Sequence, residues 1–348
     1  MRTTIKDIAR ATGFSVTTVS LVLNGKAHKI PENTKQIVLE TAKQLNYHPN
    51  QVAVSLVKRR SKTIGLILPD IRNPYFANMA RGIDEACREY GRTVIICNTN
   101  DLQERDREYV NMLVDKGVDG IIYVMAKDSS LGKNRQILKL MEDVRMPYIL
   151  LDRSLTGADD PVIEMDHLAG GYMATRYLIE LGHSRIACVK GAEGLSDSER
   201  RFQGYLKAMA EYHVPVDNNL IYEGDYSPEG GAEAVDYFVK HDFTAIFACN
   251  DASAYGVCRQ LKKYHKKVPD DISVVGYDDV SYAEMLEPPL TTIRQHVYKM
   301  GMEAVKQLLN CIKTKDKMKK TIMLEPELII RKSAARRNET NEEIFSLT

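Results

Sequence analysis

The sequence predicts a small all-α helix-turn-helix head followed by a two-lobed α/β core of doubly wound parallel sheets. Two observations lead to this fold class. Residues 1–60 contain ten Lys or Arg against three Asp or Glu, a net charge of +7 that leaves −6 on the rest of the chain. From Thr63 onward, short β-branched runs alternate with amphipathic stretches, which is the pattern of βαβ units. A basic head on an acidic body is expected where only the head meets a polyanion, either nucleic acid or an anionic membrane.

Three short helices are predicted in the head. Thr4 and Asp7 form a capping box that starts the first helix, and Gly13 ends it. Ser15 caps the second helix, and the third starts near Pro31. The second helix is expected to bury Val19, Val22 and Leu23 and to turn Val16, Thr17, Ser20 and Leu21 outward. The inward face of the third helix is expected to hold Thr34, Val38, Thr41 and Leu45.

These helices favour nucleic acid over a membrane as the partner of the head. Two short helices joined by a glycine-containing turn and braced by a third describe a helix-turn-helix, which lays its second helix in the major groove. A membrane-surface helix needs a large apolar face of its own, whereas these helices use their apolar faces on one another. A three-helix bundle with a merely solvated basic face is the alternative.

Eight strand runs divide the core into two similar halves. The first half is expected to hold Ile64–Leu68, Thr93–Cys97, Gly120–Met125 and Pro147–Leu151. The second half is expected to hold Val162–Met165, Ile186–Lys190, Ala245–Cys249 and Ser273–Tyr277. Because ligands of doubly wound sheets bind at the carboxyl ends of the strands, a ligand is expected in a cleft between two lobes.

Polar and aromatic residues follow these strands. They are Asp70, Asn73, Tyr75 and Phe76, then Asp152 and Arg153, then Asn250 and Asp251, and finally Asp278 and Asp279. Such a mixture fits a polyhydroxylated small molecule, although a nucleobase could use the same groups. Asp251 and Asp279 are expected to serve as structural caps, and Asp152 with Arg153 could form an ion pair between the lobes without a ligand.

Other functional classes find little support. The core has no GxxxxGK[ST], HExxH or GxSxG motif, so an enzyme, for example one acting on sugars, is a remote alternative. The six cysteines are scattered, which predicts free and mostly buried thiols. No metal or cofactor is expected. Without a long apolar run or a signal peptide, the protein is expected to stay in the cytoplasm.

Residues 4–60 resemble the head of the LacI/GalR family of bacterial transcriptional regulators. The resemblance rests on the run Thr4–Ala9 and on the pairs Val19-Ser20 and Asn24-Gly25, followed by the run Tyr47–Asn50. It implies that Val16, Thr17 and Leu21 read bases in the major groove and that Ser15, Ser20, Asn24 and Thr34 contact the DNA backbone. Many relatives carry Arg at the position of Leu21, which offers only apolar contact such as a thymine methyl, so the operator half-site should differ.

Residues 50–60 match the hinge helix of the same family. This segment is too short to form an isolated helix and too apolar for a solvated linker. The resemblance implies that it pairs with its twin in a homodimer and wedges Leu56 into the minor groove. The alternative is that Leu56 docks on the body.

Residues 61–332 resemble periplasmic sugar-binding proteins and, more closely, the effector core of the same regulators. Matching strings include Ile64–Asp70, Asn73–Phe76 and Val275–Asp279. The implied ligand contacts are Asn73, Phe76, Asp152, Arg153, Arg201, Asn250, Asp278 and Gln295. The arrangement is most similar to ribose-type members, except that Val124 stands where those carry a polar side chain.

The resemblance implies a repressor whose operator affinity is set by a small sugar-like effector. Alternatives are a nucleoside or purine effector, or a protein corepressor. The expected domains are a head (1–49), a hinge (50–60), the core (61–332) and a flexible tail (333–348). Within the core, lobe 1 is expected at about 61–158 and 292–320, and lobe 2 at about 159–291 and 321–332. The expected partners are near-palindromic double-stranded operator DNA and a second copy of the chain, with no membrane.

Overall fold

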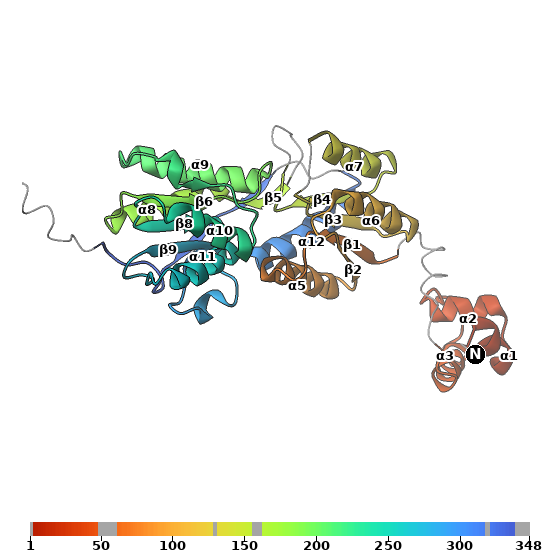
Figure 1. The fold of residues 1–348 in the computed structure, drawn as a ribbon. Coiled ribbons are helices and arrows are strands. Elements are labelled where there is room, and N and C mark those ends of the chain that lie inside the picture. The colour runs from red at the N-terminus through yellow and green to blue at the C-terminus, as the bar shows by residue number, and fades with distance from the viewer. Residues whose placement is uncertain (1–2, 48–60, 128–130, 155–161, 317–320, 338–348) are drawn as a thin grey trace, which may run out of the picture. The chain divides into compact units, whose positions relative to one another are not determined.

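The protein divides into two compact units, Met1–Ser61 and Lys62–Thr348 (Figure 1). A computed structural model describes residues 3–47, 61–127, 131–154, 162–316 and 321–337 of the chain. The hinge segment 50–60, including Leu56, lies outside the described residues.

The described part of the first unit, residues 3–47 and 61, contains three helices, α1 (Ile5–Thr12), α2 (Val16–Leu23) and α3 (Glu32–Gln44). The Asp7 carboxylate accepts hydrogen bonds from the Thr4 amide at 2.9 Å and the Thr4 hydroxyl at 2.7 Å, which fixes the start of α1. Gly13 ends that helix with φ of 74°, and the Ser15 hydroxyl accepts from the Thr18 amide at 3.1 Å to cap α2. The capping box, the glycine stop and the serine cap were all predicted from the sequence.

The three helices pack around a small apolar core. Ile8, Val19 and Val38 are fully buried, one from each helix. The prediction that Leu45 faces inward is wrong, because α3 ends at Gln44 and the Leu45 side chain is 38% exposed. Ala42, one turn after Val38, fills the inward position instead.

The second unit contains two six-stranded sheets, each forming the centre of one lobe. The first sheet has the order β11-β5-β4-β3-β1-β2. Its strands are β1 (Thr63–Leu68), β2 (Thr93–Asn98), β3 (Gly120–Tyr123), β4 (Tyr148–Leu151), β5 (Val162–Met165) and β11 (Ile322–Leu324). The helices α5 (Pro74–Glu89), α6 (Gln103–Asp115), α7 (Leu131–Asp143) and α12 (Val297–Thr314) belong to this first lobe.

The second sheet has the order β12-β10-β9-β8-β6-β7. Its strands are β6 (Ile186–Val189), β7 (Ile221–Tyr222), β8 (Ala245–Ala248), β9 (Ser273–Asp278), β10 (Thr291–Arg294) and β12 (Glu327–Ile329). The second lobe also holds α8 (His167–Glu180), α9 (Ser196–Glu211), α10 (Pro228–Phe238) and α11 (Asp251–Lys263). Strand pairing is parallel in both sheets except between β10 and β12. The predicted two-lobed parallel α/β class is therefore confirmed.

The assignment of three strands to lobes is corrected by the pairing. β5 was expected in the second half but pairs with β4 of the first sheet. Likewise β10 lies in the second sheet and β11 in the first, the reverse of the expected lobe boundaries. The chain therefore crosses between lobes after β5, after β10 and after β11. A fully buried strand has the same composition in either sheet, so the sequence pattern could not place these crossings.

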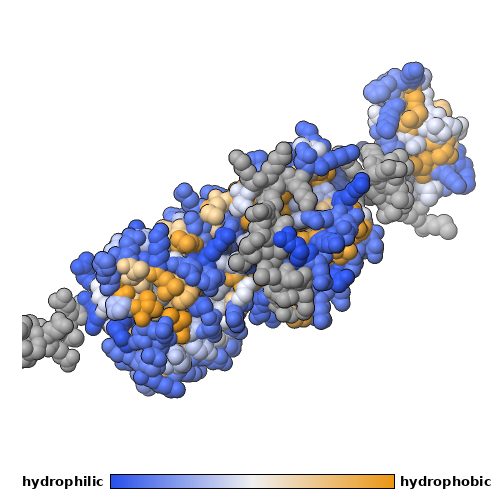
Figure 2. All heavy atoms as spheres, turned by 90° about the horizontal axis from the view of Figure 1, so that it is seen from above, coloured by the Kyte–Doolittle hydropathy of each residue, from blue (hydrophilic) through white to orange (hydrophobic). Residues whose placement is uncertain are grey.

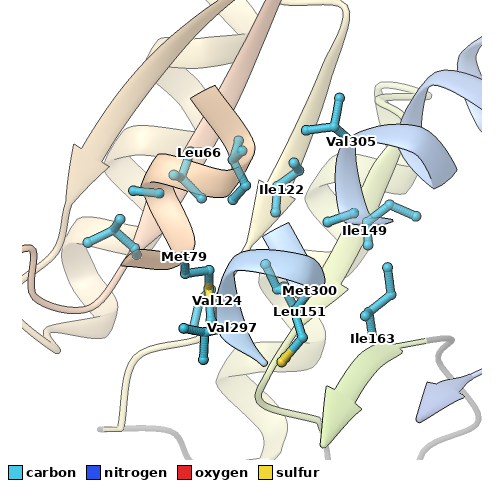
Figure 3. Packing of buried hydrophobic residues seen from close by; sticks show 14 of the residues in the cluster. Leu66, Met79, Ile122, Val124, Ile149, Leu151, Ile163, Val297, Met300 and Val305 are labelled. Carbon is cyan, nitrogen blue, oxygen red and sulfur yellow. The ribbon is translucent and has the colours of Figure 1, made fainter. Parts of the chain in front are cut away.

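One of the two apolar clusters of the first lobe lies between its sheet and the helices α5 and α12 (Figure 3), and the other involves α6 and α7. Met79 from α5 and Val297 and Met300 from α12 pack against it. Val124 lies in this same cluster and is fully buried (Figure 3). The apolar side chain of Val124 therefore packs in the cluster between the first sheet and the helices α5 and α12.

The prediction that the flexible tail begins at residue 333 is wrong, because residues 333–337 are bonded to the second lobe. Ser333 is fully buried, and its carbonyl accepts a hydrogen bond from the Val274 amide at 2.7 Å. The Ala335 amide donates to Ser273 at 3.0 Å, and the Arg337 amide donates to the Leu181 carbonyl at 2.9 Å. Residues 333–337 thus form part of the second lobe, and 338–348 lie outside the described residues.

The face of the protein seen in Figure 2 is mostly hydrophilic, with separate apolar areas. Among the described residues, no helix combines the length and the apolar character needed to cross a bilayer. The six cysteines are free thiols, and only Cys258 is not fully buried.

Candidate functional site

A cavity of about 610 Å³ opens at the carboxyl ends of the strands, with walls from both lobes. Seven of the eight residues predicted to contact a ligand line it, namely Asn73, Phe76, Asp152, Arg153, Arg201, Asn250 and Asp278. The eighth, Gln295, lies just behind the wall, where its Nε2 donates to Asp278 Oδ1 at 2.7 Å. Residues far apart in the sequence are thus brought together at the edge that parallel-sheet geometry favours for ligands.

Arg153, which follows β4, is the buried cation of the first lobe. Its Nη1 donates to Asp101 Oδ1 at 2.8 Å and to the Met125 carbonyl at 2.7 Å. The guanidinium lies 5.5 Å from the centre of the Phe76 ring. Burial alone would lower the pKa of Arg153. The negative charges of Asp101 and Asp197 raise that pKa by more than burial lowers it, so the side chain stays charged. The partner of Arg153 is therefore Asp101 of the same lobe, which replaces the suggested Asp152–Arg153 pair.

Arg201, on α9, is the buried cation of the second lobe. Its Nη1 donates to the Cys249 carbonyl at 2.6 Å and lies 3.8 Å from Asp278 Oδ1. Its Nη2 lies 3.7 Å from Asp197 Oδ2, which also accepts a 2.8 Å hydrogen bond from the Tyr226 hydroxyl. Burial would raise the pKa of Asp197, but Arg201 and Arg153 outweigh it and lower that pKa. Asp197 is therefore an anion in the wall of the cavity.

A chain of hydrogen bonds connects the two lobes beneath the cavity. The Tyr75 hydroxyl of α5 donates to the Asp152 carboxylate and lies 3.2 Å from Gln295 Oε1. Gln295, which follows β10, continues the chain to Asp278 at the end of β9. Rotation of one lobe on the other must rearrange this chain, because its ends belong to different lobes.

Two amide side chains at the rim of the cavity already make hydrogen bonds within the protein. Asn73 Oδ1 caps α5 by accepting from the Tyr75 amide at 3.0 Å. Asn250 Oδ1 caps α11 by accepting from the Ser253 amide at 2.8 Å, and its Nδ2 donates to the Tyr226 carbonyl at 3.0 Å. Both residues line the cavity but are already partly satisfied within the protein.

The environment of Asp152 and Asp278 disfavours the ionised form of their carboxyl groups. Burial and the nearby Asp197 raise the pKa of Asp152 to about 6, and burial raises the pKa of Asp278 well above its usual range. Both residues also have left-handed backbones, with φ of 69° and 121°. Such conformations cost energy in residues other than glycine and concentrate at functional sites.

Sequence reasoning missed several residues of the cavity, among them Asp197, Asp101 and Tyr226. Asp197 lies one helical turn before Arg201, so i,i+4 pairing on α9 could have suggested it. Asp101 and Tyr226 lie in connecting segments with no motif to identify them. Among the described residues, Asp197 Oδ1 and Arg153 Nε are buried without a hydrogen-bond partner, which leaves capacity for further bonds in the site.

Two other acidic residues have structural roles, but they are not the caps that were expected, and the cap of α11 is Asn250. Asp251 is fully buried, and its carboxylate accepts from the Val280 amide at 2.9 Å and the Thr292 hydroxyl at 2.5 Å. Asp279 pairs with Arg294 at 2.7 Å and with Arg331 at 2.6 Å. Neither is among the residues that line the cavity.

Asp106, on α6, lies fully buried behind the first-lobe wall. Its Oδ2 accepts from the Tyr123 hydroxyl at 2.7 Å and the Ala126 amide at 3.1 Å. Its Oδ1 has no partner among the residues that the structure describes. Burial raises the pKa of Asp106 to about 6. By holding Ala126, this carboxylate fixes the segment whose Met125 carbonyl binds Arg153.

Asp106→Asn is expected to stabilise the protein at pH 8 and to lose about half of that advantage at pH 5. The wild-type carboxyl has a pKa of about 6 when folded, against an ordinary value of 3.8, so the folded state binds more protons between these values. Stability contributed by Asp106 therefore falls as the pH rises from about 4 to about 6, by on the order of 3 kcal/mol in all. Thermal unfolding at both pH values tests this, with the exposed Asp84→Asn as control. An equal gain at pH 5 and pH 8 would contradict it.

The outward face of α2 in the head is as predicted. Val16 and Leu21 are 46% and 38% exposed, and Thr17 is exposed as well. Of the residues expected to contact a DNA backbone, Ser15 caps α2, and Asn24 Nδ2 donates to the Ser20 carbonyl at 2.8 Å. Thr34, near the start of α3, is half-buried.

Two family models together match most of the chain. "Bacterial regulatory proteins, lacI family" matches residues 4–50, and "Periplasmic binding proteins and sugar binding domain of LacI family" matches residues 61–332. A relative from Histophilus somni (strain 2336), the HTH-type transcriptional repressor PurR, is 37% identical over 332 residues, covering 95% of this chain and 98% of its own.

Solved structures with the same fold include repressors bound to DNA and to sugars. A lac repressor dimer bound to operator and the anti-inducer ONPF is similar with a TM-score of 0.87 and 26% identity, over 96% of this chain and all of the other. A LacI family transcriptional regulator from Enterococcus faecium with bound ribose is similar with a TM-score of 0.70 and 31% identity, over 79% of this chain and all of the other.

Proposed function

Because the chain belongs to the LacI family and is a DNA-binding transcriptional repressor rather than an enzyme, we propose that its effector is a small neutral sugar of pentose size. The sugar binds in the cavity between the lobes and sets the affinity of the head for operator DNA. The observation that carries this proposal is an excess of hydrogen-bond acceptors in the walls of the cavity.

The acceptors are the Asp197 carboxylate, whose pKa is lowered, and the carboxyl oxygens of Asp152 and Asp278, although burial favours the protonated form of Asp278. The buried donors that face them are largely occupied, since Arg153 binds Asp101 and Arg201 binds the Cys249 carbonyl. A ligand must therefore supply mostly donors, and a polyol does so because each hydroxyl donates one hydrogen bond. The rings of Phe76 and Tyr226 offer apolar surface for the C–H face of a sugar.

The charge of the cavity favours a neutral ligand over a phosphorylated one. Its lining includes seven carboxyl groups, those of Asp70, Asp101, Asp152, Asp197, Asp225, Glu229 and Asp278, of which burial favours the neutral form of Asp278. It includes four cations, those of Arg72, Lys127, Arg153 and Arg201. Arg72 is bound to Asp70 at 2.8 Å, and Arg153 to Asp101, which leaves little positive charge for a phosphate.

A purine base or nucleoside is the second candidate, because the PurR relatives cover almost the whole chain. A base would bind by stacking on aromatic faces. Phe76 and Tyr226 each already carry a guanidinium 5.5 Å from the ring centre, Arg153 in one case and Arg201 in the other. Each ring therefore has one free face, which serves a sugar or a base equally well, so the preference for the sugar rests on the hydrogen-bond acceptors of the cavity.

The proposed mechanism couples the cavity to the DNA through lobe rotation. A homodimer binds a near-palindromic operator, with two α2 helices in successive major grooves and Leu56 of each hinge in the minor groove. Sugar binding closes the lobes, rearranges the hydrogen-bond chain through Gln295 and weakens operator binding. Differential affinity of a few kcal/mol between the two core states is sufficient for this coupling.

A thermal-shift panel on the full chain tests the effector. Ribose and other pentoses are expected to raise Tm in proportion to the logarithm of their concentration, whereas ribose 5-phosphate is not. Stabilisation by purine bases or nucleosides alone would overturn the sugar assignment. Operator binding in the presence of the stabilising sugar then gives the sign of control, with weaker binding expected.

A further inference from the structure

The hydrogen-bond chain beneath the cavity lacks one hydrogen when the carboxyl groups at both its ends are ionised. Its three contacts join Asp152 to Tyr75, Tyr75 to Gln295 at 3.2 Å, and Gln295 to Asp278 at 2.7 Å. Each contact needs one hydrogen between its two heavy atoms. The Tyr75 hydroxyl supplies one hydrogen and the Gln295 nitrogen supplies another, whereas an ionised carboxylate only accepts. One of the three contacts is therefore left with two acceptors that face each other.

A proton on either end carboxyl completes the chain. With Gln295 Nε2 directed at Asp278, the proton belongs on Asp152. Asp152 then donates to the Tyr75 oxygen, and the Tyr75 hydroxyl donates to Gln295 Oε1. With the amide turned over, the proton belongs on Asp278, so the count is the same for both orientations of the amide. Because all four side chains are buried, a contact without a hydrogen is costly.

The surroundings of the two carboxyl groups also favour a bound proton. The charged or titratable groups that face Asp152 or Asp278 from neighbouring elements are Arg153, Arg201, Asp197, Asp251, His167 and Tyr282. The guanidinium groups oppose protonation, but burial and the nearby Asp197 raise the pKa of Asp152 to about 6. Burial and Asp251 likewise raise the pKa of Asp278 well above its usual range. His167 adds no charge, because burial and Arg201 lower its pKa to about 3.

We propose that the effector-free core holds one proton shared between Asp152 and Asp278, and that the effector releases this proton by donating a hydroxyl in its place. Both carboxyl groups line the cavity, so both are open to a ligand. A hydroxyl that donates to Asp152 frees the Tyr75 hydrogen for Gln295, and the chain is then complete without the proton. The release rests on the proposed sugar effector, because it needs a ligand rich in donors, whereas the proton of the effector-free core does not.

The proton and the effector therefore compete, which makes effector binding sensitive to acidity. Without effector, the pKa of Asp152 is about 6, and a carboxylate that accepts a ligand hydroxyl returns toward the ordinary value of 3.8. Because the effector-free core binds more protons between these values, effector affinity rises with pH across this range and then levels off. The affinity should be about tenfold lower at pH 5 than at pH 8.

Isothermal titration calorimetry of the full chain with ribose measures the released proton. At pH 5.5 the binding enthalpy is compared in two buffers that differ in ionisation enthalpy, because the buffer takes up each released proton. About 0.7 proton per chain is expected when the pKa of Asp152 falls from about 6 to its ordinary value. Equal enthalpies in the two buffers, with ribose bound, would overturn the proposal.

Two variants test whether the proton is shared. In Asp152→Asn the new amide donates permanently to Tyr75, and in Asp278→Asn it donates permanently to Gln295. Either change completes the chain without a proton, so each variant alone should release less than about 0.2 proton. The matched control is Asp84→Asn on α5, the helix that carries Tyr75, because this exposed carboxylate should leave the release unchanged. Undiminished release in either carboxyl variant would overturn the shared proton.

The effector-free core is also tested without any ligand, which separates this proposal from the choice of effector. Since the pKa of Asp152 is raised in the folded state, the stability that Asp152 contributes falls as the pH rises from 5 to 8, whereas an amide has no such loss. The Tm of Asp152→Asn relative to the wild type should therefore rise by about 3 °C between these pH values, and that of Asp278→Asn by a similar amount.

The double variant should gain no more than either single variant, because only one proton is lost. If ribose fails to bind but these shifts in Tm appear, the sugar assignment falls and the shared proton stands. If the shifts are missing, the shared proton is refuted whatever the effector is.

Discussion

Arg153→Ala is expected to abolish the thermal stabilisation given by the effector and to weaken its binding by at least about 100-fold. The wild-type guanidinium is buried, binds Asp101 and the Met125 carbonyl, and covers the Phe76 ring. Removing it takes the cationic partner from Asp101, to which the Lys127 amide still donates, and removes positive charge from beside Asp152 and Asp197. Loss of a buried ionic partner of this kind typically costs about 3–5 kcal/mol. Titration of the effector against both proteins measures the change in Kd.

The matched control is Arg72→Ala, at the rim of the same cavity. Arg72 also pairs with an aspartate at 2.8 Å, but its side chain is 82% exposed, so its removal should change effector affinity by less than about fivefold. Because Arg153→Ala also lowers stability, its unfolding is measured without effector first. An undiminished effector-induced shift in Tm would remove Arg153 from the ligand contacts.

The local signals in the sequence were sufficient for the head and for the position of the cavity. The Thr4–Asp7 box, the Gly13 stop and the Ser15 cap each act within one helical turn, so their effect is independent of the rest of the fold. Residues at strand ends such as Asp152 and Asp278 were identified because parallel sheets collect these ends at one edge. The resemblance to known regulators then added Arg201 and Gln295, for which no local pattern exists.

The partners of those residues could not be predicted in the same way. Arg153 was considered with its neighbour in sequence, Asp152, but binds Asp101, which follows a different strand of the first sheet. Asp101 and Asp152 both have left-handed backbones, and the direction of each side chain decides which carboxylate binds the buried guanidinium. A sequence pattern does not contain that information. The lobes of β5, β10 and β11 were assigned wrongly for a related reason. Which sheet a strand joins depends on its pairing with the other strands, and the sequence of the strand alone does not show that pairing.

The hydrogen-bond chain beneath the cavity lies next to one of the three segments in which the polypeptide crosses between the lobes. Gln295 follows β10 of the second lobe and precedes α12, which packs in the first lobe. Its Nε2 donates to Asp278 of the second lobe, while Oε1 faces the Tyr75 hydroxyl of the first. A ligand that contacts Asp152 and Asp278 therefore acts on the same groups that connect the lobes, which favours coupling between binding and lobe rotation.

Gly171→Ala is expected to destabilise the second lobe by about 3 kcal/mol and to weaken effector binding at the same time. Gly171 on α8 faces α9 so closely that a Cβ there would lie 2.0 Å from the carbonyl oxygen of Arg201. Since backbone atoms cannot yield as a flexible side chain does, the two helices must separate, which carries Arg201 away from the cavity. A fall in Tm of roughly 6–10 °C is expected for a unit of this size.

The reciprocal change examines the same contact from the other helix. A Cβ at Gly204 on α9 would lie 2.3 Å from the Leu168 carbonyl oxygen of α8, so Gly204→Ala should also separate the pair. Because either change opens the same interface, the double variant should lose less stability than the sum of the two single losses. Gly117→Ala is the control, since that site has φ of 65° and open space, and should cost only about 1 kcal/mol. If Gly171→Ala lowered Tm but left effector affinity unchanged, the close packing of α8 on α9 would be a requirement of folding that has no part in positioning Arg201.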